Sequence, residues 1–287
     1  MFPGRKIHLL AVLLLLLLCV ISSFAAVPQV KHVFIIVEEN HSYSSVIGSS
    51  SMPYLNGLAR RYVLATSYYA NVHPSIGNYF MLTTGHTITN NDDYTGTVTT
   101  DNIVRHLLSA GKTWKAYAES LPSVGYIGGD SFPYVKHHNP FAYLSDVRNS
   151  SNERRNLVPF SSHFASDLAN GNLPDFSFIL PNALHDAHSG SLSAADSWLR
   201  SNIAPLISSP TFRESLLVIL FDESYRTDTS HGGGHVAAIV VGPMVRSAIR
   251  IPTFFQHQNT LKTLCGVLGL GSCPGTASGA YSMAGFF

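Results

Sequence analysis

The chain has 287 residues, of which 45% are hydrophobic and 12% are charged, and its formal net charge is +1. This length suits one large α/β domain or two smaller ones. The near balance of charge excludes the basic surface of a typical nucleic-acid-binding protein and gives no attraction to an anionic membrane surface. The 14 histidines are numerous beside 18 lysines and arginines, and histidine is a frequent metal ligand and proton carrier.

The first 26 residues have the order of a secretory signal peptide. Arg5 and Lys6 precede an apolar run over residues 7–21, and small residues after it offer cleavage after Ala25 or Ala26. We therefore expect a secreted or periplasmic protein. Cleavage would lower the 18 basic residues to 16 against 17 acidic ones, which gives a net charge of −1.

A retained membrane anchor and a lipoprotein signal are the alternatives for this segment. The apolar run is short against the ~20 residues that a membrane span needs. Cys19 follows three bulky leucines, where lipoprotein signals usually carry a small residue. We expect a single domain over residues 27–287.

Apolar and helical patterns alternate along the next part of the chain. They predict strands at residues 30–37, 62–70 and 113–118, the first of them buried. They predict helices at residues 52–62, at 75–85 beginning with Ser75, and at 101–110 capped by Asp101. The first strand runs directly into Glu39 and Asn40.

Residues 121–159 are rich in Gly, Pro, Asn and Ser and show no lasting period, which predicts a long binding loop or lid. After it the pattern predicts helices at residues 161–170, 193–207 and 259–268 and strands at residues 175–180, 215–221 and 236–241. Strands that alternate with helices predict an α/β fold with a mainly parallel sheet covered on both faces.

Two cysteines remain after the expected signal segment. Cys265 and Cys273 lie eight residues apart around three glycines, in a segment that would close a small loop. In an exported protein a structural disulfide is the expected state, and two free thiols are the alternative.

Two polar pairs follow two of the predicted strands. Glu39 and Asn40 follow the first strand, and Asp222 and Glu223 follow the strand at residues 215–221. Ligands of open α/β sheets bind outside the carboxyl ends of strands, and carboxylate and amide oxygens suit Ca²⁺, Mg²⁺ or Mn²⁺, with Zn²⁺ as a further candidate. Either pair alone would more simply cap a helix or face water, but two pairs in matching positions favour one divalent metal ion.

Ser75 stands in the segment His-Pro-Ser-Ile-Gly-Asn-Tyr, before an apolar run. A helix amino terminus stabilises an anion, and a serine bonded to a cation would ionise there and attack phosphorus. Asn78, one turn later, would point its amide at a phosphoryl oxygen. The alternative is that Ser75 only caps the helix.

The remaining polar candidates are four histidines and one aspartate: His137, His138, Asp186, His188 and His235. A lone histidine is usually structural, but a histidine pair in a long loop and an Asp-x-His after a strand are more suggestive. Imidazolium groups neutralise a phosphate dianion or protonate a leaving oxygen. For His235 the alternative is that it only braces the glycine-rich turn at residues 231–235.

Five segments in this order resemble the phosphoesterase family: E-E-N-H-S-Y, H-P-S-x-x-N-Y, H-H-N-P-F, P-N-x-x-x-D-x-H, and D-E followed by G-G-G-H-V. The family includes bacterial acid phosphatases and phospholipases C of the alkaline-phosphatase-like superfamily. The similarity extends over residues 31–270 and implies a three-layer α/β/α sandwich with an alkaline-phosphatase-like fold. Gly77 stands where Pro is common in the family, so we expect a looser turn after Ser75.

The resemblance also implies roles for particular residues. One metal would be bound by Glu39, Asn40, Ser75, Asp222 and Glu223. Ser75 would also be the nucleophile, and the other catalytic residues would be His137, His138 and His188. Asn78 would contact the phosphoryl group together with these three histidines. Apart from what the resemblance implies, His73, Asp186 and His235 are further candidates for contact with substrate.

The expected function is that of a secreted, metal-dependent acid phosphatase that hydrolyses small phosphate monoesters through a phosphoserine. One alternative is a phospholipase C-type phosphodiesterase, in which a phospholipid would contact an aromatic rim formed by Tyr126, Phe132, Tyr134, Phe141 and Tyr143. Another, from a different class, is a non-catalytic secreted metal- or carbohydrate-binding protein. We expect no nucleic-acid partner and no obligate protein partner.

Overall fold

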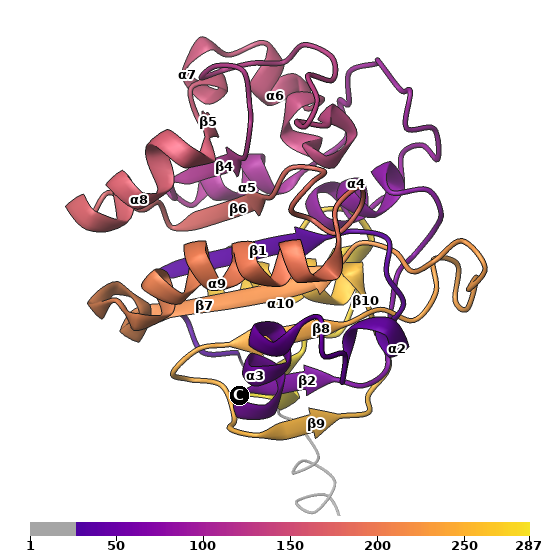
Figure 1. Ribbon diagram of the computed structural model, residues 1–287. Helices are drawn as coiled ribbons and strands as arrows, with labels where there is room; N and C mark the ends of the chain where they lie inside the picture. Colours follow the sequence, from indigo (N-terminus) through magenta and orange to yellow (C-terminus); the bar gives the residue numbers. More distant parts are fainter. Residues whose placement is uncertain (1–26) are drawn as a thin grey trace, which may run out of the picture.

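The computed structural model describes residues 27–287, so the expected signal segment lies outside the described residues. An eight-stranded sheet with the strand order β5–β4–β6–β1–β7–β8–β2–β9 runs through the molecule (Figure 1). In that order the strands are Leu157–Pro159, Trp114–Ala118, Phe176–Leu180, His32–Glu38, Ser215–Phe221, Ala238–Val241, Val63–Ala65 and Ile249–Ile251. Among these strands β8 is antiparallel to both neighbours, and the other pairings are parallel, which confirms the mainly parallel sheet.

Helices cover both faces of this sheet and confirm the three-layer arrangement. In Figure 1 one set lies in front of the sheet: α3 (Pro53–Arg61), α8 (Phe160–Asn170) and α9 (Leu192–Ser208). The other set lies behind it: α4 (Ile76–Thr84), α5 (Ile103–Ser109) and α10 (His257–Val267). Among the described residues, no helix combines the length and apolar character needed to cross a bilayer.

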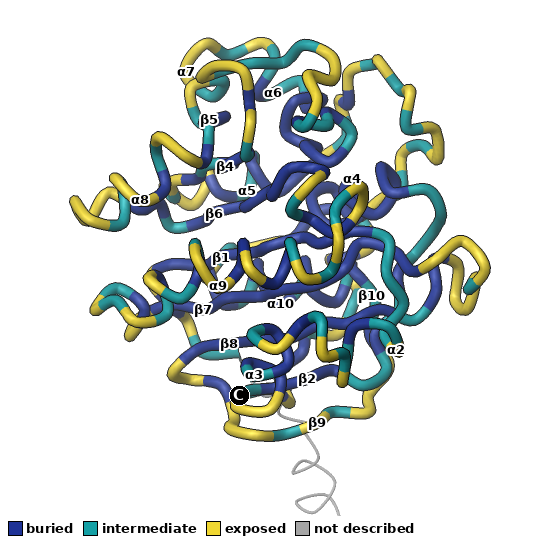
Figure 2. The backbone as a smooth tube through the Cα atoms, in the orientation of Figure 1, coloured by how far each residue is buried: buried dark blue, intermediate teal, exposed yellow. Residues whose placement is uncertain are grey.

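Strands β1 and β7 form the centre of the core. Every residue of both strands is buried, and they pair in parallel register along their whole length (Figure 2). Because they run in the same direction, the residues that follow them emerge side by side at one edge. The Asp222 N–H donates to the Glu38 carbonyl over 2.9 Å, so the two polar pairs are adjacent in space.

Helix α4 is buried on all sides, as its apolar sequence predicts. It ends at Gly85, whose φ of 70° is left-handed and whose position has no room for a side chain, since a Cβ would lie 2.5 Å from the Pro274 carbonyl oxygen. At Gly77 a Cβ would lie 2.6 Å from Cγ2 of Val72. The turn after Ser75 is therefore closely packed, in contrast to the looser turn expected there.

The segment over residues 121–159, expected to be a long binding loop or lid, forms short helices and a strand that pack into the domain, and its role in binding stays a prediction. It contains several short elements: η1 (Lys136–His138), η2 (Pro140–Ala142), α6 (Ser145–Arg148), α7 (Ser151–Arg154) and β5. Each has only three or four residues, which is too short to produce a visible sequence period. Phe141 anchors the segment by stacking on Trp114 with ring centroids 5.0 Å apart.

The expected strand at residues 62–70 is divided in two. Its first part is β2, and its second part, β3 (Tyr68–Tyr69), pairs in parallel with β10 (Phe255–Gln256) in a small second sheet. The remaining short helices are α2 (Tyr43–Val46), η3 (Pro210–Glu214), η4 (Gly275–Ser278) and η5 (Ala284–Phe286).

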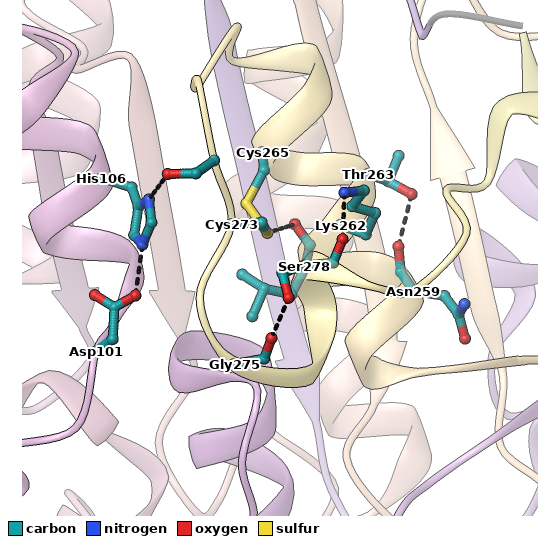
Figure 3. Close-up of a disulfide and its surroundings, with 11 residues drawn as sticks. Asp101, His106, Asn259, Lys262, Thr263, Cys265, Cys273, Gly275 and Ser278 are labelled. Carbon is teal, nitrogen blue, oxygen red and sulfur yellow. Dashed lines mark hydrogen bonds and ion pairs between the residues drawn. A yellow bond between two sulfur atoms is a disulfide. The ribbon is translucent and has the colours of Figure 1, made fainter. Parts of the chain in front are cut away.

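The cap of α5 differs from the expectation by one residue. The Asn102 side chain accepts the Val104 N–H, so Asn102 and not Asp101 caps the helix. Asp101 contacts His106 instead, over 2.8 Å from Oδ2 to Nε2 (Figure 3).

Cys265 and Cys273 form the expected disulfide, which closes the loop after α10 (Figure 3). Ser272 Oγ lies 2.8 Å from Nδ1 of His106, so the α5 side chain holds the same loop. The C-terminal segment is thus fixed to the layer that carries α4.

Candidate active site

Three carboxylates meet at the carboxyl edge of the sheet: Glu39, Asp222 and Glu223. All three are buried, with at most 2% of their surface exposed. The backbone N–H of Asn40 donates to Asp222 Oδ1 over 3.2 Å. The other oxygen, Asp222 Oδ2, has no hydrogen-bond partner among the described residues. The structure therefore brings together the two polar pairs that the sequence placed after separate strands.

Ser75 lies between two of these carboxylates. Its hydroxyl donates to Glu39 Oε2 over 3.0 Å and lies 3.3 Å from Glu223 Oε1. The side chain makes no capping bond to α4, and the residue itself has helical φ and ψ angles. The hydroxyl is therefore committed to the acidic cluster, and the capping alternative is not what the structure shows.

The acidic cluster concentrates negative charge in a buried place. Burial raises the pKa of Glu39 well above its usual value, and the nearby Asp222 and Asp186 add to the shift. Burial also raises the pKa of Asp222, with a further contribution from Glu223. Among residues 27–287, no Lys or Arg pairs with these three acids.

This donor set fits a divalent cation, since it offers carboxylate, amide and hydroxyl oxygens together with an orphaned buried carboxylate oxygen. In the described part of the chain, however, no group of three or more His, Cys, Asp or Glu side chains is already arranged as a metal site. Cation binding by Glu39, Asn40, Ser75, Asp222 and Glu223 therefore stays a proposal.

His73 holds Glu223 in place. Its Nδ1 lies 2.6 Å from Glu223 Oε2, and its Nε2 lies 3.0 Å from the Asp228 carbonyl. The hydrogen bond with Glu223 raises the pKa of His73, although partial burial acts in the opposite direction. Both ring nitrogens are engaged within the protein, so His73 positions a carboxylate, and its contact with substrate stays a prediction.

Asn78 fixes the turn that precedes Ser75. Its Oδ1 accepts the backbone N–H groups of Asn71 and Val72 over 3.0 and 3.2 Å, and its Nδ2 donates to the Val72 carbonyl over 2.8 Å. The side chain is fully buried. Its amide therefore stabilises the backbone of residues 71–72, and the expected contact with a phosphoryl oxygen stays a prediction.

His138 lies buried between two acids. Its Nδ1 is 3.2 Å from Asp186 Oδ2 and its Nε2 is 3.3 Å from Glu39 Oε1, in neither case with hydrogen-bond geometry. Burial lowers the pKa of His138 to about 3 and raises that of Asp186 to about 7. His138 thus connects the expected phosphate-binding segments to the acidic cluster.

His137 and His188 gather around His138. The ring of His137 meets that of His138 edge-on at 4.6 Å, and the ring of His188 lies 5.8 Å from it. The His188 N–H donates to Asp186 Oδ1 over 2.8 Å, and the residue is exposed. Three expected histidines thus form one cluster, of which His188 is the most accessible.

His235 lies apart from this cluster. It stacks on Tyr43 with ring centroids 4.3 Å apart and on Tyr69 with centroids 4.9 Å apart, and its Nε2 lies 3.1 Å from the Thr66 carbonyl. These contacts match the alternative in which it braces the glycine-rich turn. Its contact with substrate stays a prediction.

Two residues at the site were not expected from the sequence. Tyr79 donates its hydroxyl to Glu39 Oε1 over 2.5 Å, and its position four residues after Ser75 on a helix was a signal that could have found it. His257 places Nε2 2.6 Å from the Asp222 carbonyl oxygen, and no local pattern marks it.

Comparison with known proteins shows the family to which the chain belongs. The model of the Phosphoesterase family matches residues 48–271. The chain is 34% identical over 248 residues to the phosphatidylinositol-3-phosphatase of Mycobacterium tuberculosis, which covers 86% of this chain and 79% of that protein. It is 30% identical over 247 residues to an acid phosphatase of Aspergillus fumigatus, with 82% of this chain and 54% of that protein covered. The chain thus spans about half the length of this fungal relative.

Solved structures share the fold. A protein of the alkaline phosphatase superfamily from Vibrio parahaemolyticus superimposes with a TM-score of 0.61 at 12% identity, over 86% of this chain and 68% of that one. The lipoteichoic acid synthase LtaP from Listeria monocytogenes gives the same TM-score and identity over 91% and 76%. The family match and the mycobacterial relative place the chain in the Phosphoesterase family, as a hydrolase that acts on phosphoric ester bonds.

Proposed function

We propose that this chain is an exported, cation-dependent phosphatase that hydrolyses phosphate monoesters through a phosphoserine at Ser75. The observation that carries the proposal is the position of the Ser75 hydroxyl, 3.0 Å from Glu39 Oε2 and 3.3 Å from Glu223 Oε1. A buried serine held by acids from two distant parts of the chain suits a nucleophile better than a structural hydroxyl.

The proposed reaction has two displacements. Ser75 Oγ forms a bond to phosphorus while the bond from phosphorus to the ester oxygen breaks, and water then cleaves the phosphoserine to release phosphate. As the bond from Oγ to phosphorus forms, the hydroxyl proton of Ser75 passes to the Glu39 carboxylate, which accepts it over 3.0 Å, and it returns to Oγ when water cleaves the phosphoserine. The leaving alkoxide takes a proton from the histidine cluster, in which His188 is the exposed member.

A divalent cation would be held by Glu39, Asn40, Ser75, Asp222 and Glu223. Bound there, it would lower the pKa of the Ser75 hydroxyl and neutralise charge on the phosphoryl group. The oxygen-rich donor set suits Ca²⁺, Mg²⁺ or Mn²⁺, with Zn²⁺ as a further candidate.

Elemental analysis of the purified protein, combined with a phosphatase assay before and after chelation, tests this proposal. We expect a bound divalent metal, loss of aryl phosphate hydrolysis on chelation, and recovery when the same metal is returned. Full activity in the chelated, metal-free protein would show that no cation is needed. A bound metal without hydrolysis of any phosphate ester would favour the non-catalytic binding protein.

Export is supported by two independent features. Residues 1–26 have the order of a signal peptide, and Cys265 and Cys273 form a disulfide, which is typical of oxidising compartments. The test is the amino-terminal sequence of the protein recovered from periplasm or medium. Cleavage after Ala25 or Ala26 would support export, and recovery of the uncleaved chain from the cytoplasm would contradict it.

A phosphorylated lipid headgroup is a second candidate substrate. Phe132 is 67% exposed and Leu184 is 40% exposed, and their loops are joined by the bond from the Ala183 N–H to the Pro133 carbonyl. The same loops carry the histidine cluster, and the mycobacterial relative is named for a phosphoinositide. The aromatic rim is smaller than expected, because three of its five members are buried: Tyr134, Phe141 and Tyr143.

Assays of three substrates separate these possibilities. A soluble aryl phosphate, a phosphatidylinositol phosphate and phosphatidylcholine would be compared at equal concentration. Preference for the phosphoinositide, reduced in Phe132→Ser without loss of aryl phosphate turnover, would support the lipid. Release of phosphocholine would support the phospholipase C alternative, and turnover of the aryl phosphate alone would exclude both.

A further inference from the structure

Tyr79 connects three parts of the candidate active site. It lies on α4 one turn after Ser75, and its side chain is 1% exposed. The hydroxyl donates to Glu39 Oε1 over 2.5 Å. The ring stacks on His138 with centroids 5.3 Å apart and planes 12° apart, and packs against Phe178 of β6.

The two oxygens of Glu39 therefore have separate partners. Oε2 accepts the Ser75 hydroxyl over 3.0 Å, and Oε1 accepts the Tyr79 hydroxyl. Both donors belong to the same end of α4, four residues apart, so they lie on one helix face. A carboxylate that is bonded at both oxygens cannot rotate, and its plane is fixed relative to the nucleophile.

We propose that Tyr79 is a positioning residue that fixes the orientation of the Glu39 carboxylate toward Ser75 and toward a divalent cation. This inference rests on the proposed function. It adds a residue that acts through Glu39 and does not itself touch the phosphoryl group. Hydrogen bonds of this kind, made to a ligating side chain by a neighbour, orient the ligand and raise its affinity for the metal.

The simpler alternative is that Tyr79 only fills the core. A buried tyrosine hydroxyl needs a hydrogen-bond partner wherever it lies, so the bond alone does not prove a positioning role. Tyr117 provides a matched control within the same chain. It is also buried, and its hydroxyl donates to a carboxylate, Asp167, over 2.6 Å, but α8 carries that acid on the opposite layer from α4.

The experiment compares Tyr79→Phe and Tyr117→Phe in the whole protein as it is produced by cells. Cation affinity would be measured by calorimetric titration of the chelated protein with Mg²⁺, Mn²⁺, Ca²⁺ and Zn²⁺ in turn, and kcat and KM with an aryl phosphate. For Tyr79→Phe we expect cation affinity and kcat to fall by about 10- to 100-fold, with KM changed by about twofold or less. Tyr117→Phe should lower the melting temperature while cation affinity and kcat stay at the wild-type level.

Para-aminophenylalanine at position 79 tests the same point if Tyr79→Phe does not fold. It keeps the ring and a donor, so we expect it to retain cation affinity within about threefold of the wild type. Wild-type cation affinity and kcat in Tyr79→Phe would overturn the inference. So would a loss in the para-amino variant as large as that in the Phe variant. An active Ser75→Ala variant would instead refute the proposed function, and that result is separate from the outcome at Tyr79.

Discussion

His73 Nδ1 lies 2.6 Å from Glu223 Oε2, and this contact ties the residue two positions before the candidate nucleophile to the acidic pair that follows β7. The Ser75 hydroxyl lies 3.3 Å from the other oxygen of this carboxylate, Glu223 Oε1. His73 and Ser75, which belong to one short segment, therefore contact the same side chain.

His73→Ala removes this tie and leaves the Glu223 carboxylate free to turn. We expect kcat for an aryl phosphate to fall by about 10- to 100-fold, because supporting residues of a metal site typically contribute this much. Steady-state kinetics at saturating metal measures it. His163→Ala on α8 is the control, since within residues 27–287 the ring of this half-buried histidine hydrogen-bonds only to Ser162 and the Pro159 carbonyl. Equal kcat in the two variants would contradict the role of His73.

Asn78→Ala tests the turn before Ser75. The substitution leaves the N–H groups of Asn71 and Val72 without their acceptor, so we expect a loss of about 2–3 kcal/mol in the free energy of unfolding. Urea unfolding measures this loss. A change below about 0.5 kcal/mol, the usual range for surface substitutions, would mean that other contacts hold this turn.

Replacing both cysteines, Cys265→Ser and Cys273→Ser, opens the loop after α10. A disulfide that closes so short a loop stabilises by constraining the unfolded chain, so we expect a loss of about 2–3 kcal/mol. Turnover should stay at the wild-type level, because the disulfide is not among the active-site contacts. Thermal melts and aryl phosphate assays of the double variant check both parts, and loss of activity in a folded variant would contradict a purely structural role.

Asp175 gives a stability that depends on pH. Partial burial acts to raise its pKa, but hydrogen bonds from the Thr113 N–H and hydroxyl and from Lys112 outweigh burial and lower the pKa. A carboxyl with a lowered folded-state pKa stabilises the protein above its unfolded pKa of about 3.9 and loses this effect as pH falls through the folded value.

We therefore expect Asp175→Ala to lower the free energy of unfolding by about 1–2 kcal/mol at neutral pH, with a difference from wild type that shrinks below a pH of about 4. Urea unfolding over a pH series measures this. Asp93→Ala, which replaces an exposed aspartate, is the control, and its free energy of unfolding should stay close to that of the wild type throughout the pH series. A difference for Asp175→Ala that grew toward low pH would have the wrong sign for this account.

Much of the fold could be predicted because its central strands carry strong local signals. The apolar run at β7 was placed with the observed boundaries, and β1 was placed within two residues. The ends of these two buried strands fixed where the polar pairs would meet. Because β1 and β7 were expected to be parallel, Glu39 and Asp222 could be placed at the same edge of the sheet before any contact between them was known.

What could not be predicted depends on contacts between distant segments. The short elements within residues 121–159 are held by core packing such as that of Phe141 on Trp114, which leaves no period in the sequence. The bond between His257 and the Asp222 carbonyl joins α10 to the end of β7 and has no local signature. Asn102 and Asp101 are both good caps, and it is Asn102 whose side chain also donates to a distant residue, Asp146, over 2.9 Å.

Trapping of the phosphorylated enzyme tests the central claim most directly. The purified protein would be mixed with an aryl phosphate, quenched in acid within the first turnover, digested and examined by mass spectrometry. We predict a phosphoryl group on the peptide that contains Ser75, and neither adduct nor turnover in a folded Ser75→Ala variant. Normal turnover by Ser75→Ala, or a phosphoryl group on another residue of the active enzyme, would contradict the account.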